Sequence, residues 1–110
     1  MTIYIDDMQL VARVGPVDGV WSHLLSDLPG PAGTHELLTF AEEIGIETRW
    51  LQKPGTAHEH FDVTEPTRQR ALAAGAVSIH YGRGVAQITV AKREAMTGLA
   101  AAAETRLSDR

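Results

Sequence analysis

Residues 58–62 read His-Glu-His-Phe-Asp and carry the side chains best suited to chemistry in this sequence. If the segment is extended, alternate residues share a face, so that His58, His60 and Asp62 project together while Phe61 points into the core. Two imidazoles and a carboxylate can bind zinc, iron or manganese. The same residues also fit a polar loop in which Asp62 caps the next helix and the histidines are solvated, so both interpretations stay open.

Two neighbouring acids, Asp6 and Asp7, follow a β-branched and aromatic run that predicts a first strand. Adjacent strand residues face opposite ways, so only one of the two acids is expected in a given site. We expect Asp7 to join His60 and Asp62 as a metal ligand. The alternative is a pair of turn-forming acids that end the strand. His23 is a candidate proton donor or acceptor, or a hydrogen-bonded, half-buried histidine.

A second group of residues is suited to binding a phosphorylated ligand. An indole beside a guanidinium can stack on a base, which makes Trp50 with Arg49 a candidate pair, and Gln52 lies two residues further on. Arginine side chains can form paired hydrogen bonds to phosphate, which suggests Arg68 and Arg70. The alternative is that Trp50 fills the core and that the arginines lie on a solvated helix face.

Composition excludes several classes of protein. The chain has 110 residues, a formal net charge of −4 and no cysteine, which excludes disulfides, thiolate metal sites and a cysteine nucleophile. The acidic balance disfavours a wide nucleic-acid interface. No apolar run reaches about 18 residues and no basic segment opens the chain, so we expect no membrane span, no signal peptide and a cytoplasmic location. P-loop, Rossmann and GxSxG motifs are absent.

The elements that must position these residues predict a small α/β sandwich in one domain, residues 1–110. Hydrophobic periodicity and turn residues indicate the order β-β-α-β-α-β-β-α, with residues 8–20 as a loop. A helix over residues 34–44 should bury Leu37, Phe40, Ala41 and Ile44. The expected strands are residues 2–5, 20–25, 47–52, 76–80 and 85–90, and the other helices are residues 64–75 and 91–107.

The last segment, residues 81–110, should complete a β-hairpin through the turn at 81–84 and then form a helix. An isolated alanine-rich helix is marginal in water and needs a packing partner. We expect that partner to be a second copy of the chain, giving a homodimer. The apolar stripe of the predicted helix consists of Ala91, Ala95, Met96, Leu99, Ala103 and Leu107.

Six short motifs occur in this chain in a fixed order: Ile3-Tyr4-Ile5-Asp6-Asp7; Trp21, His23, Leu24 and Asp27; Glu36, Leu37, Phe40, Ala41, Ile44 and Gly45; Arg49, Trp50 and Gln52; His60-Phe61-Asp62; and Ala71, Gly75 and Ala76. In this respect residues 1–80 resemble DUF4031, a small bacterial and phage domain of unknown function. Two positions depart from its pattern, because Leu38 stands where a histidine is expected and Phe61 where a tyrosine is expected. The resemblance implies no activity, but it implies that Asp7, His23, Gln52, His60 and Asp62 form one recurring polar set.

Three functions remain open. The first is a non-catalytic domain that binds a nucleotide or phosphate ligand, in which Trp50 stacks and Arg68 or Arg70 meets the phosphate. The second is a metal-assisted phosphoester hydrolase in which His60, Asp62 and Asp7 hold the ion, with His23 and His60 as the catalytic histidines and Gln52 and Trp50 positioning the substrate. The third is a dimeric protein-interaction module.

Overall fold

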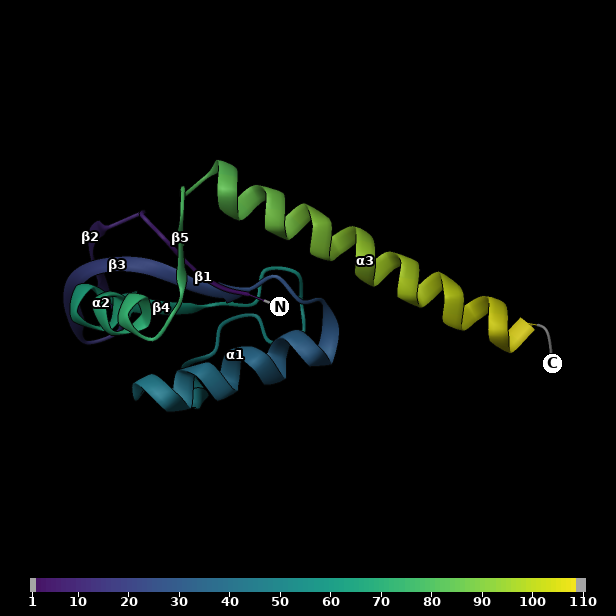
Figure 1. The fold of residues 1–110 in the computed structure, drawn as a ribbon, viewed down its shortest axis with the longest axis horizontal. Coiled ribbons are helices and arrows are strands. Elements are labelled where there is room, and N and C mark those ends of the chain that lie inside the picture. The colour runs from purple at the N-terminus through teal and green to yellow at the C-terminus, as the bar shows by residue number, and fades with distance from the viewer. Residues whose placement is uncertain (1, 109–110) are drawn as a thin grey trace.

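In the part of the chain that the structure describes, a five-stranded mixed sheet with three helices packed around it forms the domain, which confirms the predicted α/β class (Figure 1). The computed structural model describes the backbone of residues 2–108 and the side chains of residues 2–98. In chain order the elements are β1 (Ile3–Asp6), β2 (Leu10–Val14), β3 (Val17–Ser26), α1 (Gly30–Ile44), the 3-10 turn η1 (Thr48–Trp50), β4 (Phe61–Thr64), α2 (Glu65–Ala73), β5 (Val77–Ile79) and α3 (Arg83–Ser108).

The long strand β3 is the centre of the sheet. Trp21 pairs with both Leu10 of β2 and Thr64 of β4, so β2 and β4 lie on opposite edges of β3. Strand β1 also pairs antiparallel with β3, through Ile5 opposite Leu24, and β5 pairs in parallel with β1. Strands β1 and β2 therefore follow each other along one edge of β3 as a single interrupted strand.

The interruption between β1 and β2 is a bulge built around Asp6. The Asp6 carboxylate accepts a hydrogen bond from the Met8 amide at 3.2 Å, and Gln9 adopts a positive φ of 46°. The Gln9 amide donates to the Ser22 hydroxyl rather than to a backbone carbonyl. Bulges redirect side chains next to functional sites, and this one directs the buried Asp6 carboxylate toward β3.

The two faces of the sheet have different roles, because successive strand residues point to opposite sides. Ile5, Leu24, Phe61 and Val63 point to one face and form the core with residues of α1 and α2. The intervening residues therefore point to the other face, which the first turns of α3 partly cover (Figure 1). The core contains Ile3, Ile5, Leu24, Leu37, Ala41, Ile44, Ile46, Phe61, Val63, Ala71 and Ala76.

Helix α1 begins earlier than predicted, at Gly30 rather than Thr34. Pro31 fits the first turn because its missing N–H would have no partner there, so residues 30–33 form the first turn of the helix. The helix ends at Ile44, as predicted, and Gly45 follows it in the left-handed conformation. Of the predicted stripe, Leu37, Ala41 and Ile44 are buried, but Phe40 is only half-buried at the edge of the core.

Three local predictions are wrong. Residues 8–20 are not a loop: they contain β2 and the start of β3, which are joined at Gly15 and Pro16. The alternation signal is missing there because most of β2 is exposed on both faces. The predicted strand at 47–52 is absent, and the 3-10 turn η1 occupies residues 48–50 of that segment. Residues 85–90 are helical, so the predicted hairpin at 81–84 does not form.

Helix α3 extends well beyond the domain in Figure 1, and its first turns pack against the sheet. Thr89 and Lys92 are buried, whereas Ala91 and Ala95 of the predicted stripe are exposed. Positions 85, 88, 89, 92 and 96 form the covered face at helical spacing, which explains why this β-branched segment is helical. The side chains of Leu99, Ala103 and Leu107 lie outside the described part of the chain. The homodimer therefore stays a prediction, which sedimentation of the full-length protein would check.

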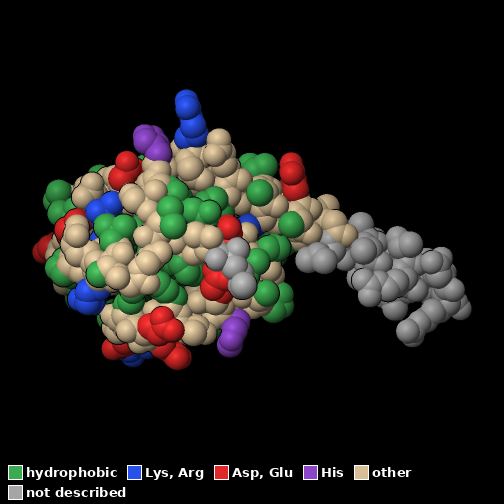
Figure 2. Space-filling model, in the orientation of Figure 1, with side chains coloured by type: hydrophobic (Ala, Val, Ile, Leu, Met, Phe, Trp, Pro, Cys, Tyr) green, Lys and Arg blue, Asp and Glu red, His purple; other side chains and the backbone are tan. Residues whose placement is uncertain are grey.

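No described helix has the length and apolarity required to cross a membrane. On the face shown in Figure 2, Lys and Arg side chains are scattered among acidic ones and form no continuous basic surface.

Candidate metal centre

The register between β3 and β4 brings together three polar side chains on the face away from the core. His23 of β3 lies directly opposite Asp62 of β4, and residues directly opposite have close Cβ atoms. His60 precedes Asp62 by two residues and so shares its face. The core residues Leu24, Phe61 and Val63 occupy the alternate positions and point the other way. The hydrophobic alternation of two strands therefore places His23, His60 and Asp62 on the same side of the sheet.

These three side chains lie close enough together that they could hold a metal ion. One ligand atom from each residue can be chosen so that all three lie within 4.8 Å of one another. The Asp62 Oδ1 atom lies 3.4 Å from His60 Nε2 and 3.7 Å from His23 Nε2. Two ligands at about 2.1 Å from a tetrahedral ion are about 3.4 Å apart. The side chains are 21%, 21% and 26% exposed for His23, His60 and Asp62, so one side of the cluster is open to solvent.

Hydrogen bonds fix the ring orientation of both histidines. His23 Nδ1 lies 2.7 Å from Asp6 Oδ2, and His60 Nδ1 lies 2.7 Å from the carbonyl oxygen of His58. A carboxylate and a carbonyl can only accept, so both Nδ1 atoms carry the proton and donate. In the neutral rings, both Nε2 lone pairs then face the Asp62 carboxylate. This cluster of acceptors needs a cation or a further proton, and its outer hydrogen bonds are those typical of metal-binding histidines.

The pKa directions agree with that electrostatic picture. Desolvation of His60 opposes its charged form, but hydrogen bonds to Asp62 and to the His58 carbonyl and the charge of Asp62 outweigh it, so the pKa of His60 is raised. The hydrogen bond from His60 lowers the pKa of Asp62 against its own desolvation, with further help from the charges of His60 and His23. The site therefore attracts positive charge.

Asp6 and Asp7 have different surroundings. Asp6 is fully buried and accepts hydrogen bonds from the amide and the ring of His23. Asp7 is exposed, and its carboxylate accepts a hydrogen bond from the Tyr81 amide at 2.6 Å, which lowers the pKa of Asp7. The Tyr81 ring stacks on the His23 ring, with centroids 5.6 Å apart. Tyr81 therefore links Asp7 to His23, but Asp7 is not one of the three candidate ligands of the cluster.

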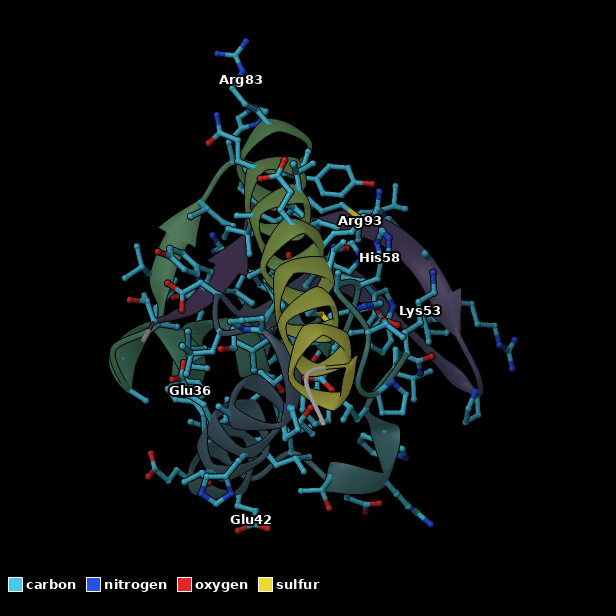
Figure 3. The ribbon with its side chains drawn as sticks, turned by 90° about the vertical axis from the view of Figure 1, so that its right-hand side faces the viewer. Glu36, Glu42, Lys53, His58, Arg83 and Arg93 are labelled. Carbon is cyan, nitrogen blue, oxygen red and sulfur yellow. The ribbon has the colours of Figure 1, made fainter. Side chains whose placement is uncertain are left out.

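Two cavities flank the cluster. The first, of about 210 Å³, is lined by His23, His60 and Tyr81 together with Lys53, and is partly closed by α3. The second, of about 470 Å³, lies between the β2–β3 hairpin and η1, and Asp62 and Gln52 belong to its lining. Lys53, His58 and Arg93 lie on the same side of α3 in Figure 3. Of these three residues, Lys53 and His58 line the first cavity.

Several residues predicted to bind metal or ligand lie outside the cluster of His23, His60 and Asp62. Arg68 is buried and donates to the Asp6 carbonyl, and Arg70 donates to the Ile44 carbonyl at the end of α1. Neither lines the two flanking cavities. His58 lies in a turn before β4 and lines the first cavity, but it is not in the cluster, and its Nε2 atom lies 2.8 Å from an Arg93 nitrogen. Trp50 is 54% exposed, so it does not fill the core.

The sequence predicts Asp7 as the acid of the site, but in the structure it is Asp6 whose carboxylate contacts the His23 ring. The signal for Asp6 was present, because Ile3 and Ile5 alternate as core residues and assign Tyr4 and Asp6 to the opposite face. Lys53 and Tyr81 had no such signal. Each lies in a connecting segment whose path depends on tertiary packing.

Comparison with known proteins identifies the family without an activity. No curated protein and no solved structure shows significant similarity to the chain. The sequence pattern of DUF4031, described as a protein of unknown function, matches residues 3–94. The match continues into the first half of α3, beyond the limit near residue 80 set by the short motifs. Since it spans most of the sequence, the chain belongs to the DUF4031 family.

Proposed function

We propose that His23, His60 and Asp62 bind one divalent metal ion and that the site hydrolyses a phosphoester in a phosphorylated ligand such as a nucleotide. The observation that carries this proposal is the orientation of the cluster. Both histidines use Nδ1 as a donor, and both Nε2 atoms are left beside the Asp62 carboxylate. Two nitrogens and one carboxylate oxygen form the ligand set of many mononuclear zinc and iron sites.

The protein residues supply orientation and charge. Asp6 holds His23 in the tautomer that keeps Nε2 free, and the His58 carbonyl does the same for His60. Lys53 lines the cavity that contains both histidines and offers a cation to a phosphate group. A divalent ion in such a site polarises a phosphoryl oxygen and lowers the pKa of water. In this ligand set His23 takes the place that the sequence predicts for Asp7, because the Asp7 carboxylate accepts a hydrogen bond from the Tyr81 amide.

The first experiment measures metal binding to the full-length protein after chelation and dialysis. Equilibrium dialysis against Zn²⁺, Mn²⁺ or Fe²⁺ is expected to give one bound ion per chain. His60→Ala should lose that ion. His35→Ala is the control: it removes an exposed histidine on α1 and should keep the ion. A wild-type protein that retains no ion, or two variants that behave alike, would contradict the metal centre.

The second experiment tests the chemistry. With the ion bound, the protein should release the chromophore from a chromogenic phosphodiester, and His60→Ala should not. The competing function is non-catalytic binding of a nucleotide or phosphate ligand, which the cationic Lys53 and Arg49 beside the two cavities favour. Ligand binding that persists in chelator, with no hydrolysis under any metal, would support that alternative instead.

A further inference from the structure

The second cavity has the composition of a site for a flat aromatic group. It is lined by two indoles, those of Trp21 and Trp50, and by apolar residues of the β2–β3 hairpin such as Val14 and Val17. Trp21 is largely buried, and its Nε1 atom donates to the Ala12 carbonyl at 2.9 Å. The polar atom of Trp21 is therefore already paired, and its ring offers only apolar surface to the cavity. At about 470 Å³, the cavity lies within the usual range for small-molecule sites.

Trp50 differs from Trp21 in its exposure. Its side chain is 54% exposed although η1 holds its backbone in place. The Arg49 guanidinium carbon lies 5.8 Å from the Trp50 ring centre, within the range of a cation–π contact. Val14 and Val17 are also exposed, at 38% and 43%. Indole and guanidinium surfaces stack on nucleobases without a strict sequence requirement, so these exposed groups fit a base.

Polar groups define the two ends of the cavity. Gln52 pairs with His60 through an isolated β-bridge, so its position is tied to the metal centre. Its side-chain amide can both donate and accept a hydrogen bond at a base edge. Asp62 lines the cavity and also belongs to the metal cluster. A ligand in this cavity is therefore next to the cluster.

We infer that the cavity between Trp50 and the β2–β3 hairpin binds the base of a nucleotide, whose phosphate lies at the metal cluster toward Lys53. The inference rests on the proposed function and specifies its substrate class. A simple sugar phosphate or an alkyl phosphate would leave the indole surfaces uncovered. A nucleotide covers them and offers its anionic group to the cluster, where Lys53 and the bound ion carry positive charge.

The test compares ligands with and without a base. Isothermal titration of the full-length, metal-loaded protein is carried out with the four ribonucleoside monophosphates and with ribose phosphate. At least one nucleotide should bind about 5- to 150-fold more tightly than ribose phosphate, which is the contribution of one stacked base. Trp50→Ala should remove that preference and leave ribose phosphate affinity unchanged. Trp50→Phe, which keeps an aromatic face, should retain most of the preference.

Val11→Ala is the matched control, because Val11 belongs to the same hairpin and is 80% exposed but does not line the cavity. It should bind all ligands as the wild type does. Nucleotides that bind no more tightly than ribose phosphate would overturn the inference, as would a preference that survives in Trp50→Ala. Metal binding is measured separately in each variant. A wild type without metal therefore refutes the proposed function, whereas a metal-loaded wild type without base preference refutes only this inference.

Discussion

Replacing Asp6 by asparagine should weaken metal binding without unfolding the domain. The Asp6 Oδ1 atom accepts hydrogen bonds from the backbone amides of Met8 and His23, at 3.2 and 2.9 Å. These two donors fix the orientation of an asparagine side chain in the same place, with its oxygen toward the amides. Its NH₂ group then faces His23 Nδ1, where the wild type has a carboxylate oxygen at 2.7 Å.

That exchange reverses the hydrogen bond to the ring. An amide NH₂ only donates, so His23 Nδ1 must accept and the ring proton moves to Nε2. The protonated Nε2 cannot bind a metal ion. Loss of such an outer hydrogen bond lowers metal affinity about 10- to 100-fold, or about 1.4–2.8 kcal/mol. The free energy of unfolding should fall by no more than about 1.5–3 kcal/mol, the contribution of a hydrogen bond to a charged group.

Competition with a chromophoric chelator measures the affinity, urea unfolding measures the stability, and nitrogen NMR of the imidazole rings reports the tautomer of His23. Asp7→Asn is the control, because it makes the same change in the neighbouring, exposed acid and keeps an acceptor for the Tyr81 amide. The reasoning is refuted if Asp6→Asn binds metal as the wild type does, or if Asp7→Asn weakens binding equally.

Two further predictions concern stability. Burial lowers the pKa of Lys92 despite the charges of Glu59 and Asp27. The unfolded chain therefore binds the ammonium proton of Lys92 more tightly than the folded chain does. As a result, the free energy of unfolding should rise with pH between the lowered pKa and 10.5, the ordinary lysine value. Urea unfolding across that pH range should show the rise in the wild type and a smaller one in Lys92→Met, and equal slopes would contradict the assignment. Leu37 is fully buried and Phe40 only half-buried. In chemical denaturation Leu37→Ala should therefore cost about 2–5 kcal/mol, and Phe40→Ala should cost less than the about 3–5 kcal/mol typical of a buried phenylalanine. A loss within that range for Phe40→Ala would show that the helix packs differently.

The parts of the fold that sequence patterns predict are those with a buried stripe. Leu37, Ala41 and Ile44 recur at helical spacing, and Gly45 provides the left-handed residue that ends α1. Strand β2 has no such stripe, since its residues are exposed or half-buried, so the sequence pattern predicts a loop there. The segment at 85–90 is rich in β-branched residues, but packing of its helical face against the sheet overrides that local preference.

The candidate site was predicted in part for the same reason. His60 and Asp62 are two residues apart, so their common face follows from strand alternation alone. The place of His23 depends on the register between β3 and β4, which pairs residues 39 positions apart in the sequence. No local pattern encodes that pairing. Phosphate binding by Arg68 and Arg70 stays a prediction; in the structure both side chains donate to backbone carbonyls, Arg68 in a buried hydrogen bond and Arg70 in a partly buried one.

The alternation that builds the core also sets the position of every proposed metal ligand. Leu24, Phe61 and Val63 fix the register of β3 and β4 because each must reach the core. A slip of one residue would expose these three side chains and turn His23 or Asp62 inward, where an unpaired polar group is costly. The register that buries the most apolar surface is therefore the one that assembles the cluster. Substitutions that loosen the core should consequently weaken metal binding even where they touch no ligand.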